Sequence, residues 1–466
     1  MKISGRTFVI LFAVILSITA ILHFLFFFQI FNDCCYLLLS SRLLSLAAFV
    51  WLAFRRKSLT TWILISLLLG AEFGHDLPEI AVHMQLFSKI FLNMIKTIIA
   101  PLLFATLVVG IAGHSNIRQV GRMGWKSILY FEIITTIALF IGLAAINISK
   151  AGVGVEVPEK FMHNTLPQVT KLTTDEIILH AFPENIAKAI YEGQILQVVI
   201  FSLLFGFAIT MLKENHRSTM LKFAEGLSET MFKFTNIVMY LAPLAVFSAI
   251  AASVGHMGID ILSTLFKLLA TLYVALLMLL FFVLLPIALY LKIPIKNFFL
   301  ALSDSISLAF ATTSSESAMP RAMEALEKFG VPRKVVAFVM PMGYSFNLDG
   351  TTLYLSLATI FVAQISGIHL DFGQQLFMVF TLMLTSKGVA GVPRASLVIL
   401  LGTATQFGLP TWPIFIILGI DELMDMGRTT VNLIGNCFST VVIAAWEKEF
   451  DYDKAINFKP EDLTEG

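Results

Sequence analysis

Charged residues are scarce in this chain. Asp, Glu, Lys and Arg make up 14% of its 466 residues, whereas about a quarter is usual in a soluble domain. The chain therefore lacks the polar surface needed to face water on all sides, and 57% of its residues are hydrophobic. Its 32 basic and 31 acidic residues nearly cancel, so we expect no nucleic-acid partner.

Cysteine is also rare. The chain has three cysteines, Cys34, Cys35 and Cys437, and no CxxC pair. Two of the three are adjacent in sequence, so neither a disulfide framework nor a zinc site is indicated. We expect no cofactor.

A signal-peptide cleavage site is missing as well. Lys2 and Arg6 precede an apolar stretch at residues 7–30, and no small-x-small site follows it. The stretch is also longer than the apolar part of a usual signal peptide. It is therefore predicted to be a retained membrane helix.

Long apolar runs are abundant. A helix needs about 20 apolar residues to cross the hydrocarbon core, so the sequence predicts an all-α membrane protein with many spans. The candidate spans are residues 7–30, 36–54, 59–73, 86–113, 127–148, 194–212, 234–256, 261–291, 335–368 and 409–446.

Basic residues predict the orientation. Arg55, Arg56 and Lys57 lie between the second and third spans. Together with Lys2 and Arg6, they place both ends of the first hairpin in the cytoplasm by the positive-inside rule.

Two stretches are too polar to span a membrane. Residues 149–193 are rich in Pro, Gly, Lys and Glu and are predicted to form an external loop with short helices. The acidic residues 447–466 are predicted to form a solvated, mobile tail.

Two segments of the second half are interrupted helices. Residues 298–326 and 377–407 are moderately apolar, but each contains a tip of small residues, at 312–317 and 386–393. A helix facing lipid could not break there, because its freed backbone groups would lack partners. Paired interrupted segments indicate the binding site of a transporter, and the alternation of tips and spans suggests an internal repeat.

The last span carries a polar stripe. Asp421, Asp425, Arg428, Asn432 and Asn436 follow one another at intervals of three or four residues, which places them on one helical face. Asp425 and Arg428 could simply neutralise each other. That explanation accounts for two residues of the five, so we favour a ligand pathway.

The preceding span contains Asp349 as its only charge near the middle. Gly350 directly after it favours an unwound turn, whose carbonyls could join the carboxylate around a hard cation. A buried Asp hydrogen-bonded to Ser and Thr is the alternative. In the first tip, Ser314 and Ser315 could donate hydrogen bonds to a carboxylate, although a serine run often marks only a loop.

Glu132 is the only charge in span 127–148, and Thr135 and Thr136 follow it. Desolvation favours the protonated form of a carboxylate, so Glu132 is a candidate proton carrier. It is equally consistent with an interfacial residue at a helix end.

Four segments together resemble a known family, the dicarboxylate/amino acid:cation symporters or glutamate transporters, and in particular its bacterial proton/sodium–glutamate symporters. These segments are residues 343–351, 314–320, 386–393 and 425–436, and the resemblance covers about residues 59 to 446.

The resemblance implies a homotrimer in which scaffold helices hold an elevator-like transport domain with two re-entrant hairpins, at 298–326 and 377–407. It implies four divisions of the chain. These are an extra transmembrane hairpin at 1–58, mostly scaffold at 59–256 with 127–148 in the transport domain, the transport domain at 257–447, and a cytoplasmic tail at 448–466.

The resemblance also implies residue roles. Arg428 would bind the side-chain carboxylate of the substrate, and Asp425 its amino group. The remaining substrate-binding residues would be Thr351, Thr429, Asn432, Ser315, Val392 and Pro393. Three cation sites are implied: Asp349, Asn347, Thr135 and Thr136 for the first; Gly343, Asn347, Asn432 and Asn436 for the second; Ser345 and residues 386–389, with Ser386 and Val389, for the third.

Three residues depart from the family pattern. Asn436 stands where many sodium-coupled members have Asp, and Glu132 stands where archaeal members have Tyr. These two bear on the coupling ion. Arg394 follows Pro393, where a small residue is usual, and bears on the outer gate.

The implied function is a symporter, not an enzyme, that imports glutamate or aspartate with protons, sodium ions or both. It would be a multi-pass protein of the plasma (inner) membrane, surrounded by lipid, with both termini cytoplasmic. A C4-dicarboxylate symporter is the alternative, which Asp425 disfavours because its charge would repel a dianion. An intramembrane aspartyl protease using Asp349 and Asp425 is disfavoured because the chain has no GxGD motif and Arg428 would keep Asp425 ionised.

Overall fold

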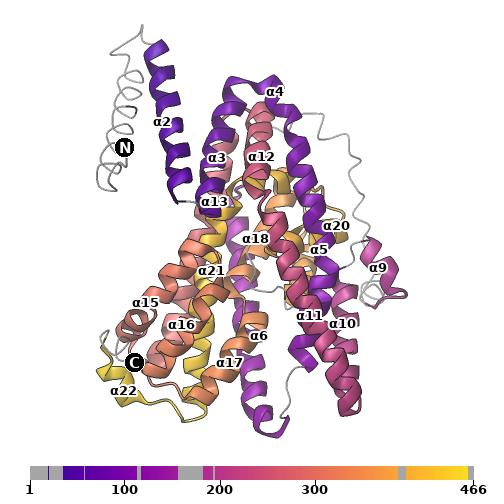
Figure 1. The fold of residues 1–466 in the computed structure, drawn as a ribbon, viewed down its shortest axis with the longest axis vertical. Coiled ribbons are helices and arrows are strands. Elements are labelled where there is room, and N and C mark those ends of the chain that lie inside the picture. Colours follow the sequence, from indigo (N-terminus) through magenta and orange to yellow (C-terminus); the bar gives the residue numbers. More distant parts are fainter. Residues whose placement is uncertain are drawn as a thin grey trace.

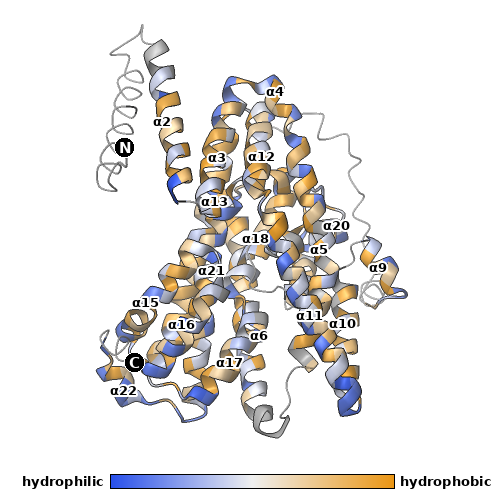
Figure 2. Ribbon diagram, viewed as in Figure 1, coloured by the Kyte–Doolittle hydropathy of each residue, from blue (hydrophilic) through white to orange (hydrophobic). Residues whose placement is uncertain are grey.

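The computed structural model describes residues 19, 35–56, 58–112, 117–155, 182–192, 195–386 and 395–459. The regular structure of these residues is all helix, with no strand, which confirms the predicted all-α class. Five of the described helices are long and apolar enough to cross a membrane, or six when a bent pair counts as one span. Hydrophobic residues predominate along these helices, and hydrophilic ones gather near their ends (Figure 2).

One group of helices packs around α12 and α5. It comprises α3 (Leu59–Asp76), α4 (Pro78–His83), α5 (Gln85–Ala112), α9 (Ile186–Glu192), α10 (Ile195–Thr210), α11 (Glu214–Met239) and α12 (Ala242–Met257). Of these, α3, α4 and α5 contact α12, α10 and α11 contact α5, and α9 contacts α10. The backbones of α3 and α12 approach closely because α3 has glycines at the contact: a Cβ on Gly70 would lie 2.6 Å from Phe247 O, and one on Gly74 would lie 2.5 Å from Ala251 O. The two helices stand side by side in Figure 1.

The predicted span at residues 234–256 is corrected by the structure. The chain leaves α11 at Tyr240 and Leu241, and α12 continues at an angle of 51° to it. Pro243 lies in the first turn of α12, where its missing N–H is tolerated but an unbroken helix is not. The span is therefore a bent pair.

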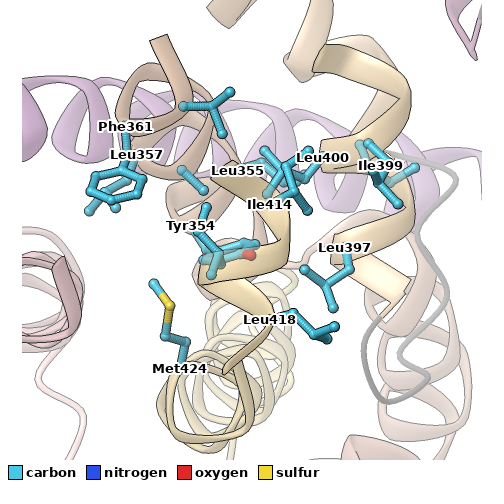
Figure 3. Packing of buried hydrophobic residues seen from close by; sticks show 14 of the residues in the cluster. Tyr354, Leu355, Leu357, Phe361, Leu397, Ile399, Leu400, Ile414, Leu418 and Met424 are labelled. Atoms are coloured by element: carbon cyan, nitrogen blue, oxygen red, sulfur yellow. The ribbon is translucent and has the colours of Figure 1, made fainter. Parts of the chain in front are cut away.

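The second group contains the two interrupted segments and the polar stripe. It comprises α6 (Ile117–Ser149), α13 (Ile261–Leu279), the π-helix η1 (Leu280–Leu284), α14 (Leu285–Tyr290), α15 (Ile295–Thr312), α16 (Ser315–Lys328), α17 (Arg333–Phe346), α18 (Asp349–Ile365), α19 (Phe372–Thr385), α20 (Ala395–Gln406) and α21 (Trp412–Trp446). At its centre α18 is buried along almost its whole length and contacts α6, α20 and α21. Figure 3 shows Tyr354 and Phe361 of α18 in the apolar core that Leu400 of α20 and Leu418 of α21 also enter.

The first predicted tip is confirmed as a break between two helices. Thr313 adopts a left-handed conformation with φ of 51° after α15. Ser314 then caps α16, where its hydroxyl accepts a hydrogen bond of 3.3 Å from the N–H of Ser317. The second tip lies between α19 and α20, and its residues 387–394 are outside the described part of the chain.

The long apolar region at 335–368 is broken too, but not where the sequence predicts. The chain unwinds at Asn347 and Leu348, and Asp349 already begins α18. Gly350 is needed for another reason. A Cβ on it would lie 2.4 Å from Arg428 O, so its absence allows α18 to pack against the backbone of α21.

The second predicted span is observed as α2 (Cys35–Arg56). Arg42 attaches it to α3, with Nε 3.0 Å from Glu72 Oε2. Of the first predicted span, residues 7–30, only Thr19 is described.

The structure agrees with the prediction for the first polar stretch more fully than with that for the second. Residues 149–193 contain the short helix α9, as predicted, and residues 156–181 within them lie outside the described part. Most of residues 447–459 are exposed, as a solvated tail predicts, but Phe450 and Phe458 are buried, so this part of the tail is docked on the protein.

Both tail rings pack on the same aromatic residue. Their centroids lie 5.7 and 6.1 Å from that of Phe329, which follows α16. Two apolar residues within a mainly acidic segment thus hold the tail against Phe329, just beyond the first interrupted segment. Only residues 460–466 of the tail are outside the described part.

Candidate functional site

The polar stripe of α21 lies inside the protein. Asp421, Asp425, Arg428, Asn432 and Asn436 are each at most 4% exposed. They face neighbouring helices of the second group and not the outer surface. Each therefore needs partners within the protein, since an isolated buried charge or amide is costly.

Arg428 is held by two carboxylates and an aromatic ring. Its Nε donates to Asp425 Oδ1 at 2.8 Å, and its Nη1 donates to Asp421 Oδ1 at 3.0 Å. Its guanidinium carbon lies 4.3 Å from the ring centroid of Tyr354, whose hydroxyl donates to Asp421 at 3.3 Å. The ion pair of Asp425 and Arg428 considered in the sequence analysis is thus present. Asp421 adds a second carboxylate, so the three side chains together carry a formal charge of −1.

The first tip reaches this cluster. Ser315 donates from its hydroxyl to Thr429 O, with an oxygen–oxygen distance of 3.4 Å. The hydroxyl of Thr429 in turn donates to Asp425 at 2.9 Å. The structure therefore brings together the break between α15 and α16 and the charged part of α21.

Asn432 caps the start of α18 from outside that helix. Its Oδ1 accepts hydrogen bonds from the N–H groups of Gly350 at 2.8 Å and Thr351 at 3.2 Å. Its Nδ2 donates to Thr351 Oγ1 at 2.8 Å. The first N–H groups of a helix lack partners within it, so Asn432 both satisfies them and fixes Thr351 beside the charged cluster.

Asp349 is fully buried in the first turn of α18, where the helix dipole favours a negative charge. Asn347 Nδ2 donates to its Oδ2 at 3.3 Å. Gly435 leaves room for this carboxylate, since a Cβ there would lie 2.2 Å from Asp349 Oδ2. Asn347 Oδ1 is buried and has no hydrogen-bond partner among the described residues, so an oxygen atom is available for a ligand at this point.

Asn436 of α21 contacts the same region at the end of α17. With its amide oriented to satisfy both neighbours, its Nδ2 donates to the main-chain oxygens of Gly343 at 3.1 Å and Asn347 at 3.2 Å. The break between α17 and α18 is thus surrounded by four residues of the first and second implied cation sites, namely Gly343, Asn347, Asp349 and Asn436. In the described part of the chain, no three His, Cys, Asp or Glu side chains gather as metal ligands. The oxygen donors here are mostly amide and main-chain groups.

The residues of α6 are more spread out. Glu132 is half-buried. Thr135 is buried and donates to Phe131 O at 2.7 Å, while Thr136 directs its hydroxyl to Met383 Sδ on α19 at 3.4 Å. Thr135 and Thr136 therefore point to different neighbours, and only Thr135 is enclosed.

The second tip is described only at its start. Ser386 is buried and donates to Met383 O at 3.3 Å. The side chain of Ser345 lies outside the described part, as do Val389, Val392, Pro393 and Arg394.

Two contributors to the site were not assigned a role from the sequence. Asp421 belongs to the predicted stripe, and its spacing of two helical turns from Arg428 was a signal for their pairing. Tyr354 follows Thr351 by three residues on α18, which places both on one helical face. Its stacking on Arg428 depends on the approach of α18 to α21, which no local pattern shows.

Comparisons with known proteins identify the family of this chain. The model of the sodium:dicarboxylate symporter family matches residues 59–446. A proton/sodium-glutamate symport protein of Bacillus caldotenax is 39% identical over 418 residues, which cover 87% of this chain and 99% of the relative. A proton/glutamate-aspartate symporter of Escherichia coli is 40% identical over 384 residues, 80% of this chain and 87% of the relative.

A third relative carries a different substrate in its name. The C4-dicarboxylate transport protein of Bacillus subtilis is 37% identical over 406 residues, 86% of this chain and 96% of the relative. The family match and these identities extend over both groups of helices and the whole polar stripe. This chain is therefore a membrane protein that belongs to the sodium:dicarboxylate symporter family.

Proposed function

We propose that the protein is a secondary active symporter that imports glutamate or aspartate together with protons, sodium ions or both. Relatives named as glutamate and glutamate-aspartate symporters support this function. The observation that carries it is the buried cluster of Asp421, Asp425 and Arg428. Charges of both signs inside a membrane protein suit a zwitterionic solute with an additional carboxylate.

In the proposed binding mode, Arg428 binds the side-chain carboxylate of the substrate through two parallel N–H groups, which suit the planar guanidinium. Asp425 then turns to the amino group of the substrate, while Asp421 keeps its contact with Arg428. The surrounding polar groups would be Thr351, Thr429, Asn432 and Ser315, together with Val392 and Pro393 of the second tip.

A C4-dicarboxylate substrate is the second candidate, because a relative carries that activity in its name. Such a substrate has no amino group to compensate Asp425, which is 4% exposed. We therefore expect Asp425→Ser to weaken glutamate and aspartate uptake far more than succinate or fumarate uptake. Equal losses for both classes of substrate would show that Asp425 serves only to support Arg428.

For the coupling ion, Asn436 supports a role for protons. Its amide N–H groups donate to Gly343 O and Asn347 O, and these two carbonyls would otherwise be ligands for sodium in the second cation site. The first site would be formed by Asp349 and Asn347 with Thr135 and Thr136 of α6. Glu132 is the proposed proton carrier, and the third site would lie around Ser345, Ser386 and Val389.

We also propose the family architecture for this chain, with an elevator-like transport domain and a homotrimeric assembly. The two groups of helices support a division into mostly scaffold at 59–256 and transport domain at 257–447. The extra hairpin at 1–58 is proposed from the sequence. Residues 127–148 are assigned to the transport domain because α6 packs along α18. The hairpins 298–326 and 377–407 would be re-entrant.

The inner membrane and cytoplasmic termini complete the proposal. The experiment that tests it is radiolabelled uptake into proteoliposomes, with proton and sodium gradients imposed separately. We expect glutamate or aspartate to accumulate and a proton gradient alone to drive measurable uptake. Uptake that requires sodium and ignores an imposed pH gradient would overturn the assignment of Glu132, and no accumulation under either gradient would overturn the proposed function.

A further inference from the structure

An apolar cavity lies between four helices of the second group, away from the polar stripe. Its volume is about 180 Å³, and η1, α14, α15 and α21 line it with Leu, Ile, Phe and Ala side chains only. Leu284 and Ala288 form one wall, Phe298 the second, and Ile434 and Phe438 the third. No charged or hydroxyl-bearing side chain contributes to the lining.

The cavity lies at the surface of a membrane span. The residues of η1 and α14 form the last part of the span Ile261–Tyr290, and at its rim Phe281 and Phe299 are 58% and 42% exposed. In a bilayer this surface faces hydrocarbon. Apolar cavities of roughly 150 Å³ remain dry and take up hydrocarbon ligands, so an acyl chain suits this one.

Basic residues flank the cavity at one end. Lys292 directly precedes Ile293 and Lys296 directly follows Ile295, and both isoleucines line the cavity. Both lysines are exposed, and neither forms an ion pair within the part of the chain that the structure describes. A cation next to a hydrocarbon-binding cavity complements the phosphate of a lipid.

The leaflet of the bilayer that the cavity faces follows from the other residues at the end where Lys292 and Lys296 lie. The tail packs there, because Tyr452 donates to Leu291 O at 3.1 Å and Lys454 donates to Glu327 O at 3.0 Å. Further basic residues lie at this end, namely Lys328, Arg333 and Lys334, each next to a glutamate. By the positive-inside rule this is the cytoplasmic end, where the leaflet carries negatively charged lipids.

We propose that this cavity binds one acyl chain of an anionic phospholipid from the cytoplasmic leaflet, whose phosphate contacts Lys292 and Lys296. The bound chain lies against Ile434 and Phe438. These residues follow Asn432 and Asn436 of the stripe by two residues on α21, so the lipid contacts the helix that carries the site. The proposal does not depend on which substrate is transported.

The test measures phospholipid retained by the purified full-length protein, by native mass spectrometry during titration with phosphatidylglycerol or phosphatidylcholine of the same acyl chains. We expect preferential retention of phosphatidylglycerol. Ala288→Phe fills the cavity and should weaken retention roughly tenfold, because excluding even two methylene groups from an apolar site costs about that factor in affinity. Leu289→Phe is the matched control, since Leu289 is 63% exposed and does not line the cavity.

A second pair of variants tests the headgroup without touching the interior. The double variant Lys292→Gln and Lys296→Gln should remove the preference for phosphatidylglycerol. The control is Lys213→Gln with Lys222→Gln, two exposed lysines of the α11 region. The proposal is overturned if wild-type protein retains both lipids equally, if Leu289→Phe lowers retention as much as Ala288→Phe, or if both lysine pairs have the same effect.

Discussion

Arg428 is the largest fully buried side chain in the described part of the protein. Two carboxylates and the ring of Tyr354 stabilise its charge. We expect Arg428→Cys to abolish glutamate and aspartate uptake, because no other cation of the stripe can bind the substrate carboxylate. Initial uptake rates in proteoliposomes measure this effect, and undiminished uptake would contradict the proposed binding mode.

Stability provides the control for that variant. Removing one partner of a buried ion pair costs about 3–5 kcal/mol, since the other charge stays buried. Adding Asp421→Asn to Arg428→Cys should therefore recover part of the thermal stability but no uptake, since it removes one of the two carboxylates left without a cation. If uptake returned with stability, Arg428 would be a structural residue only.

Asn436 offers a gain-of-function prediction. In Asn436→Asp the carbonyls of Gly343 and Asn347 lose an amide donor, and the region gains a carboxylate, which hard cations favour. We expect uptake to become more dependent on sodium at constant pH. Asn436→Ser, which removes the amide without adding charge, is the control, and an unchanged sodium dependence in Asn436→Asp would contradict the explanation.

For single residues, the sequence predicts which side chains form the buried site better than it predicts which side chains they contact. The spacing of Asp421, Asp425 and Arg428 was enough to place them on one buried face. The interactions of Arg428 with Tyr354 and of Asn432 with Thr351 depend on contacts between α18 and α21. Helix periodicity contains no information about such contacts between distant segments.

Among the helices, the crossing of α18 and α21 depends on Gly350. A Cβ at this position would lie 2.4 Å from Arg428 O, and backbone atoms cannot move aside cheaply. We expect Gly350→Ala to destabilise the protein by about 1–3 kcal/mol, as overpacking usually does, and to reduce uptake. Thermal unfolding in detergent and uptake rates measure the two effects.

Gly226 provides the matched control for this prediction. It lies within α11 and a Cβ there would meet no atom within 4 Å. Gly226→Ala should therefore be neutral or stabilising by about 0.5–1 kcal/mol, since alanine favours helix. A similar response of both variants would show that the close approach of α18 and α21 is not what makes Gly350 necessary.

The helices themselves were largely predictable, because apolar length and small-residue tips are local properties. Their breaks were less so. Hydropathy ran through the bend near Pro243, and the glycine after Asp349 predicted an unwound turn at Asp349 and Gly350, whereas the helix breaks at Asn347 and Leu348. In both cases the position depends on neighbouring helices that satisfy the freed backbone groups.

For the whole molecule, the C-terminal segment joins parts that are distant in sequence. It contains α22 (Tyr452–Asn457), and Phe458 directly after this helix packs its ring on Phe329. We expect Phe458→Ala to lower stability by about 3 kcal/mol, the usual cost of removing a buried ring. Ile456→Ala is the control, since Ile456 is 58% exposed, and equal melting temperatures of the two variants would contradict a structural role for the tail.

This docking could not be predicted from the sequence, because the average composition of the tail favours a solvated segment. Residues 447–466 are acidic on average, and such segments are usually solvated. Phe450 and Phe458, eight positions apart, nevertheless dock the segment, because both pack on Phe329 at the end of α16. Whether isolated apolar residues find a partner is a property of the tertiary structure.

The pairing of Arg428 with its own carboxylates has a consequence for affinity. In the proposed binding mode, a substrate carboxylate must displace Asp425, a competitor tethered at very high effective concentration. The free energy of that internal pair is subtracted from the binding free energy, so the substrate is held less tightly than its contacts alone would allow. A carrier must release its substrate in every cycle. Here the Asp425 carboxylate can re-form its pair with Arg428 and so favours release of the substrate.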